Sequence, residues 1–390
     1  MKSGFSAAVL AALFTTVFSA EACTSWVLKP EVTESGRMFI QKVLDVPYRN
    51  RLDADIRVAS SGWRWIRVGS FGHGASMGMN EKGVAITTNC GDLNGDLPPS
   101  DGERHTMASY ELVWLVKSCA TAEEAVEAIK RIGRNGLFVY GLKNYGTIVL
   151  VADARRAFLV EIGNGYAEAA EVTGGIHVVA NAWSLPGGES VSLSALTSIR
   201  GNRARKACAV KSLQDNRVDG KYTLRGCFDT SRKIRRSKFS ESDVFVPGSR
   251  KARNMSLETA CFEIDPEFPA YLSCAYIALG PQRHTVYLPV PMALRQLPDK
   301  IRDGRWGEMA YAHQEAFGPE HGDLPRMTEL EDKFIAEFKE TRDRARRLLK
   351  DGKKDEAVKL LNDCFDRQYA EADKLMTALY SAAKSKIAEK

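Results

Sequence analysis

The chain has 390 residues, of which 44% are hydrophobic and 27% are charged, so it has enough apolar residues for a sizeable core. Its 55 basic and 49 acidic residues give a net charge of +6 that is spread along the chain, which is only a weak indication of anionic partners. Composition therefore indicates a soluble globular protein, with no internal repeat and no low-complexity linker.

The first 22 residues differ from the rest. Lys2 precedes an apolar run at 7–18, and Ala20, Glu21 and Ala22 follow it, which is the pattern of a secretory signal with an A-x-A cleavage site. The apolar run is too short to span a bilayer comfortably, so we expect no stable membrane insertion. Cleavage after Ala22 would make Cys23 the first residue of the mature chain. Lipidation at Cys23 is the alternative, but glutamate at position 21 fits a lipobox poorly.

Short apolar, β-branched runs predict strands in the segment that follows: 24–28, 38–43, 63–68 and 84–88. The sequence at 78–83, with its asparagine and two glycines, predicts a turn that needs positive φ. Residues 107–132 predict two helices, and Thr121 with Glu124 is typical of a capping box at the start of the second helix.

Further strands are predicted at 147–152, 157–162, 176–180, 271–279 and 285–289, and a helix is predicted at 192–213. From about Thr328 the chain is charged and helix-prone, with one apolar stripe at Leu330, Phe334 and Phe338. Strands and helices in blocks favour an α+β layered architecture. We expect a main domain at 23–300 and a helical C-terminal extension at 301–390.

Cysteine and histidine spacing argues against a metal site. The eight cysteines contain no C-x-x-C pair, and His73, His105, His177 and His284 are scattered. Disulfide connectivity cannot be assigned from these positions. The basic run at 232–238 is expected to be a solvated loop rather than a nucleic-acid site, because an exported chain seldom meets nucleic acid.

A cysteine at the mature N-terminus carries a strong nucleophile next to its own base. The reference pKa of an α-amine, about 7.7 to 8.0, suits proton transfer near neutral pH. Activated by that amine, the Cys23 thiol would attack an amide carbonyl, release an amine and leave a thioester that water cleaves.

Three further residues could support this chemistry. Asn181, at the end of the strand predicted at 176–180, could direct its amide N–H groups at the developing oxyanion. Asp45 could accept hydrogen bonds from the α-amine, and the cation of Lys42, three residues earlier, would favour the thiolate. Each residue also has an ordinary structural interpretation, and it is their order behind Cys23 that indicates a site.

Taken in order, several short segments resemble the N-terminal cysteine hydrolases, the superfamily of choloylglycine hydrolases, linear amide hydrolases, penicillin acyltransferase-like enzymes and related dipeptidases. The matching segments are Cys23-Thr24, Lys42-Val43-Leu44-Asp45, 78–83, 153–161, Ala180-Asn181 and 198–203. The resemblance covers about residues 23–289 and rests on the ensemble, since no single segment is specific. It implies a four-layer αββα sandwich.

The resemblance also implies roles for five residues. Cys23 would be nucleophile and base, and Asp45 would bind the α-amine. Asn181 and a backbone amide near Asn89 would form the oxyanion hole, and Arg200 would support the site. Bile salt hydrolases have arginine where this chain has Lys42, which keeps the charge and loses the bidentate fork. The spacing of 83–89 also differs from theirs, and both departures weaken a bile-salt assignment more than a hydrolase assignment.

The sequence therefore predicts a secreted or periplasmic amidase with no cofactor, acting on a small linear amide. An acyltransferase of the same fold is one alternative, and a lipid-anchored binding protein without activity is another. A third treats the helical extension as an interaction module, whose removal near Thr328 would spare catalysis and abolish oligomerisation. The acyl group, the amine and the oligomeric state, including a homo-oligomer, stay open.

Overall fold

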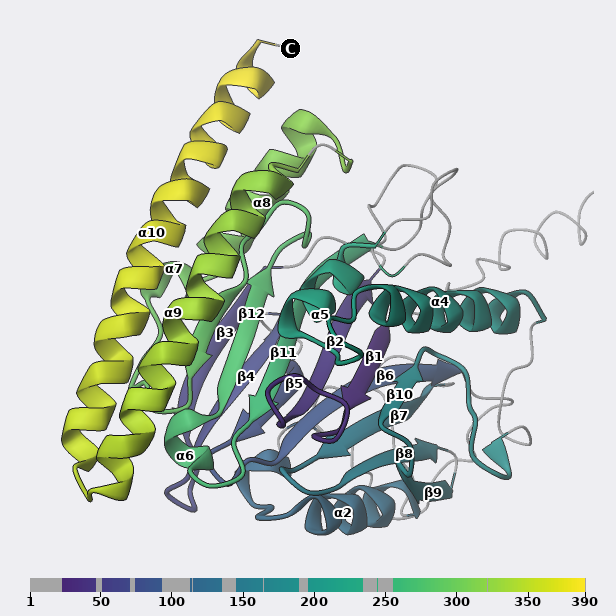
Figure 1. Ribbon diagram of the computed structural model, residues 1–390. Coiled ribbons are helices and arrows are strands. Elements are labelled where there is room, and N and C mark those ends of the chain that lie inside the picture. The colour runs from purple at the N-terminus through teal and green to yellow at the C-terminus, as the bar shows by residue number, and fades with distance from the viewer. Residues whose placement is uncertain are drawn as a thin grey trace, which may run out of the picture.

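The computed structural model describes residues 23–46, 51–70, 74–92, 113, 115–134, 145–163, 165–188, 196–233, 244, 255–320 and 322–389. The expected signal peptide at 1–22, most of the first of the two helices expected within 107–132, and most of the basic run at 232–238 lie outside these residues. Within them the chain forms two antiparallel sheets with helices on their outer faces (Figure 1).

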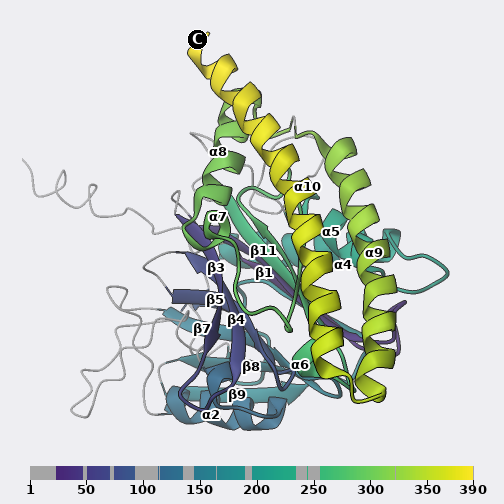
Figure 2. The ribbon, with the colours of Figure 1, turned by 90° about the vertical axis from the view of Figure 1, so that its left-hand side faces the viewer.

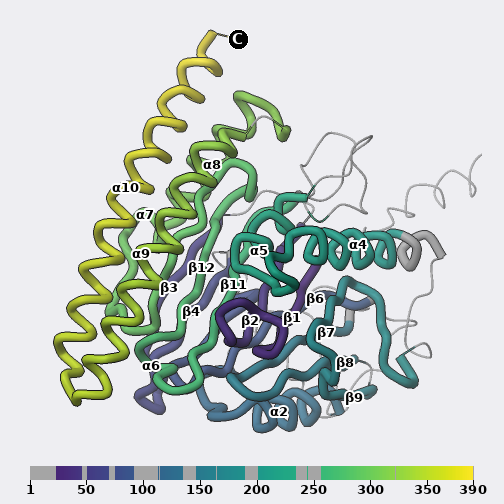
Figure 3. The backbone as a smooth tube through the Cα atoms, in the orientation of Figure 1, coloured from purple at the N-terminus to yellow at the C-terminus, as the bar shows by residue number. Residues whose placement is uncertain are grey.

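The first sheet holds the predicted nucleophile and is built from segments that lie far apart in the sequence. Its six strands stand in the order β10 (Ile176–Val179), β1 (Thr24–Leu28), β2 (Met38–Val46), β11 (Met255–Ile264), β12 (Cys274–Leu279) and β13 (Leu288–Pro291). Strands β2 and β11 lie side by side although more than 200 residues separate them, as the colours of Figure 3 show. All five residues of β1 are buried, as expected of an interior strand covered on both faces.

The second sheet is a seven-stranded meander, in which each strand pairs with the next along the chain. Its strands are β3 (Leu52–Val58), β4 (Arg64–Ser70), β5 (Gly74–Asn80), β6 (Ala85–Asp92), β7 (Tyr145–Ala152), β8 (Ala157–Gly163) and β9 (Tyr166–Glu171). The turn predicted at 78–83 joins β5 to β6. There the Asn80 side chain accepts hydrogen bonds from the amides of Lys82 and Val84, and Gly83 has a φ of +86°.

Helices complete the layers. On the outer face of the second sheet lies α2 (Ala122–Arg134), which buries Ala122, Ala125, Val126 and Ile129, the spacing of one helical face. Over the first sheet lie α4 (Leu196–Asp215) and α5 (Leu224–Ser231), so helix, sheet, sheet and helix follow one another in Figure 1. This order confirms the predicted α+β, four-layer αββα sandwich.

The C-terminal third adds more helices along the side of the two sheets (Figure 2). These are α6 (Pro269–Leu272), α7 (Asp299–Arg302), α8 (Arg305–Phe317), α9 (Leu324–Lys350) and α10 (Lys354–Ala388). The expected stripe on α9 is buried at Phe334 and Phe338, and Leu330 packs at its edge. Phe334 joins the core between the sheets, whereas Phe338 joins the core on the outer face of the first sheet.

Candidate active site

Cys23 lies at the start of the interior strand β1, with its side chain in the core between the two sheets. Its thiol is fully buried and lies 3.9 Å from the backbone carbonyl of Asp45 on the neighbouring strand β2. Asp45 is also fully buried, and its carboxylate accepts a hydrogen bond from the hydroxyl of Ser256 on β11. Pairing of β1, β2 and β11 therefore holds a thiol and a carboxylate together at one end of the first sheet.

Asn181 reaches the same place from the end of β10. Its Nδ2 donates to the carbonyl of Cys90 at 2.7 Å, which leaves the second hydrogen of that amide group for another acceptor. Its Oδ1 accepts from Nη1 of Arg205 at 3.1 Å, which defines the orientation of the carboxamide. A donor held in this way can stabilise charge that develops on a bound carbonyl oxygen.

Arg205 is the residue of this site that the sequence patterns do not predict. It projects from α4, is almost fully buried, and donates from the same Nη1 to the backbone carbonyl of Cys23 at 3.1 Å. One turn earlier on α4, Asn202 accepts from the backbone amide of Asn181 at 3.4 Å. The spacing of Asn202 and Arg205, three apart on one helical face, is the signal that could have indicated this pair.

Arg200, the arginine that the family resemblance implies, lies in α4, but its side chain is outside the described residues. Its supporting role stays a prediction.

Asn89, on the inner face of β6, ties the second sheet to the site. Its Oδ1 accepts from the hydroxyl of Ser25 at 2.8 Å, and its Nδ2 donates to the carbonyl of Ala180 at 3.2 Å. Because Ser25 follows Cys23 by two residues and Ala180 precedes Asn181, Asn89 links the strands that carry the thiol and the carboxamide.

Lys42 is fully buried between the sheets, and its ammonium donates to the carbonyl of Thr88 on β6. Strand register places Lys42 opposite Ser25, on the same inner face as Cys23. The structure thus gathers Cys23, Lys42, Asp45, Asn89 and Asn181 around one end of β1. Their chemical roles stay predictions.

A second buried acid lies in the same layer. Glu258, on the inner face of β11, accepts from the hydroxyl of Ser76 at 3.1 Å. Burial raises the pKa of the Glu258 carboxyl to about 7, against the opposing influence of Ser76, Lys42 and Arg67. A carboxyl that titrates near neutral pH in a buried site is typical of a functional region.

Other parts of the molecule do not share in this site. Across the described ranges, no three acidic, histidine or cysteine side chains are grouped so as to hold a metal ion. His73 and His105 lie outside those ranges. No described helix is both long and apolar enough to cross a bilayer.

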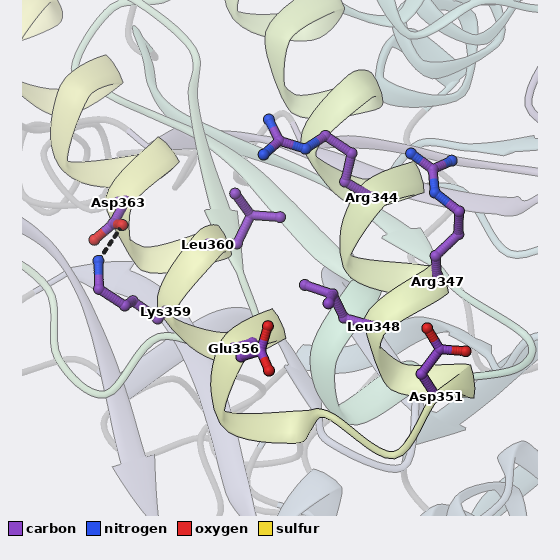
Figure 4. Close-up of a pocket in the computed structure, with 8 residues that line it drawn as sticks. All are labelled: Arg344, Arg347, Leu348, Asp351, Glu356, Lys359, Leu360 and Asp363. Atoms are coloured by element: carbon purple, nitrogen blue, oxygen red, sulfur yellow. Dashed lines mark hydrogen bonds and ion pairs between the residues drawn. The ribbon is translucent and has the colours of Figure 1, made fainter.

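A groove between α9 and α10 is lined by side chains of both charges together with two leucines (Figure 4). On α9 these include Arg344, Arg347 and Leu348, and on α10 they include Glu356, Lys359 and Leu360. None of the residues around Cys23 lines this groove.

Comparison with protein-family models finds no match, and no curated protein sequence matches the chain. Among solved structures, the chain is similar to penicillin V acylase from Agrobacterium tumefaciens, with 15% identity, a TM-score of 0.40, and coverage of 66% of this chain and 86% of that one. It is also similar to a mutant of conjugated bile acid hydrolase from Clostridium perfringens, with 13% identity, a TM-score of 0.47, and coverage of 69% and 92%. Both similarities are in overall structure at low sequence identity, so the chemistry of this chain is inferred from its own residues.

Proposed function

We propose that this protein is an exported amidase, matured by removal of residues 1–22, that cleaves a linear carbon–nitrogen amide bond through a thioester on Cys23. Residues 23–300 would carry the chemistry, and 301–390 would form the helical extension. The observation that carries the proposal is the position of Cys23 at the start of an interior strand, where Arg205 donates hydrogen bonds both to its carbonyl and to the carboxamide of Asn181.

The steps follow from the residues around the thiol. The α-amine of Cys23, held by Asp45, takes the thiol proton directly or through one water, and the sulfur attacks the amide carbonyl. Asn181 and a backbone amide near Asn89 stabilise the resulting oxyanion. The amine leaves with the proton, and water then attacks the thioester to release the acid.

This mechanism needs no cofactor, because the thiol, the amine and the amide donors all come from the chain. Lys42 adds a buried cation on the same face as the thiol, which favours the thiolate.

The test is to recover the exported protein, determine its N-terminal residue by mass spectrometry, and quench it in acid during turnover of a panel of N-acyl amides. We expect Cys23 as the first residue and an acyl adduct on the N-terminal peptide that hydroxylamine removes. Cys23→Ala should show neither adduct nor turnover. Cys364→Ala, a buried cysteine of α10, is the matched control and should retain both.

Two outcomes would redirect the assignment. A diacylglycerol on Cys23, or full activity of a chain that starts at another residue, would contradict the N-terminal nucleophile. Transfer of the acyl group to an added amine instead of water would make the protein an acyltransferase that uses the same site.

A further inference from the structure

Glu258 is a buried carboxyl near the site to which the mechanism above gives no role. Glu258 has no exposed surface, and Ser76 donates to its Oε1 at 3.1 Å. Its Oε2 accepts no hydrogen bond from any residue in the described ranges. A carboxyl kept in such a place is costly unless nearby charge compensates it, so its surroundings indicate what it does.

Strand register fixes how Glu258 lies relative to the thiol. On β1 and β2, Thr24 pairs with Val43, which puts Cys23 beside Leu44. On β2 and β11, Leu44 pairs with Glu258. Cys23, Leu44 and Glu258 therefore form one row across three adjacent strands, and two strand spacings separate the first from the last by about 10 Å.

Charged side chains of opposite sign surround this row. Lys42 stands two residues before Leu44 on the same face of β2. Arg67 of β4, which is paired with Asp53 of β3, adds a smaller electrostatic influence on Glu258. On the other side of β11, Glu258 faces the apolar Leu279 of β12. Lys42 and Glu258 thus share the layer between the sheets, where the Lys42 ammonium acts electrostatically on the Glu258 carboxyl.

We infer that Glu258 is a positioning residue of the Cys23 site, whose carboxylate balances the buried Lys42 ammonium and so sets the electrostatic potential at the Cys23 thiol. This inference rests on the proposed function only in taking Cys23 as the nucleophile. Lys42 favours the thiolate of Cys23, and ionised Glu258 opposes that effect from β11, two strands away from β1. The raised pKa of Glu258 makes this balance change near neutral pH.

The test measures the thiol itself and needs no amide substrate. The protein is treated with chloroacetamide across a pH series, and the alkylation rate at Cys23 is read from its own peptide by mass spectrometry, with the other cysteines as internal references. Glu258→Gln keeps the shape of the side chain and removes the charge. For one charge at about 10 Å and an effective dielectric constant of ~20, the variant should lower the apparent pKa of the Cys23 thiol by about one.

Glu263→Gln is the matched control, because Glu263 is a buried acid on the same strand whose partners, Arg342 and Arg37, lie on the outer face. It should leave the alkylation profile of Cys23 unchanged. A Glu258→Gln profile that superimposes on the wild type, in a folded protein, would overturn the inference, as would an equal shift in Glu263→Gln.

Should Glu258→Gln fail to fold, Ser76→Ala replaces it. Loss of the Ser76 hydrogen bond disfavours the ionised carboxylate, so the profile should shift in the same direction, and an unchanged profile would overturn the inference. If the wild type cleaves no amide but Glu258→Gln still shifts the alkylation profile of Cys23, the proposed amidase is refuted and this role of Glu258 is supported.

Discussion

Replacing Arg205 tests whether the site works as a unit. Its Nη1 donates to both the carbonyl of Cys23 and Oδ1 of Asn181, each at 3.1 Å, and its side chain is buried. A hydrogen bond from a charged donor contributes about 1.5–3 kcal/mol. At ~1.4 kcal/mol per tenfold change, losing the bond that orients Asn181 should lower kcat/KM by roughly 10- to 150-fold.

The assay compares Arg205→Met and Arg205→Lys with the wild type on whichever amide the wild type cleaves. Lysine keeps the charge but has no planar fork, so we expect it to lose less than methionine. Arg203→Met is the control, because Arg203 is exposed on the same helix two residues earlier. Wild-type kcat/KM in folded Arg205→Met, or an equal loss in Arg203→Met, would refute the role given to Arg205.

Three further predictions concern stability. Glu331→Ala removes a fully buried carboxylate that accepts hydrogen bonds from two arginines and a backbone amide. It should lower the free energy of unfolding by about 3–5 kcal/mol, and an unchanged denaturation midpoint would contradict this. Gly146→Ala puts a Cβ into the ring of Trp183 and should cost about 1–3 kcal/mol in the free energy of unfolding, whereas Gly174→Ala, whose Cβ would meet only one backbone oxygen at 3.8 Å, should be near neutral. Burial raises the pKa of Glu258 to about 7, so the folded protein holds the proton on this carboxyl more tightly than the unfolded chain does. The resulting contribution to the free energy of unfolding is fully present below the ordinary carboxyl pKa and is lost as pH rises through about 7. Denaturant titrations at a series of pH values should therefore show the free energy of unfolding of the wild type falling by up to ~3 kcal/mol over that window. A wild type whose free energy of unfolding depends on pH as little as that of Glu258→Gln would contradict the raised pKa.

The strands that sequence patterns predict well are those whose residues favour the extended state by themselves. The run at 24–28 becomes β1 with the expected bounds, because aromatic and β-branched residues fill it. In contrast, β3 and β9 carry aspartates or alanines and glutamates, which have low strand propensity. Both are edge strands of the second sheet, and pairing with β4 and β8 holds them extended.

Site residues divide in a similar way. Cys23, Asp45 and Asn181 could be named because each follows a local signal, either a cleavage site or the end of an apolar strand. Arg205 could not, because its contacts depend on how α4 crosses the first sheet and not on its neighbours in the chain. Glu258 could not be predicted for the same reason, since only the pairing of β11 with β2 brings it into one row with Leu44 and Cys23.

The same strand, β11, connects the site to the C-terminal helices. On its inner face it presents Glu258 to the layer that holds Lys42, and on its outer face it presents Glu263, which pairs with Arg342 of α9 and accepts from the hydroxyl of Tyr276 at 3.1 Å. Removing the chain from about residue 328 would leave Glu263 without Arg342 and uncover the apolar surface under α9. Because β11 pairs directly with β2, the helical extension supports the strand beside the site, and we expect its loss to cost stability and activity together.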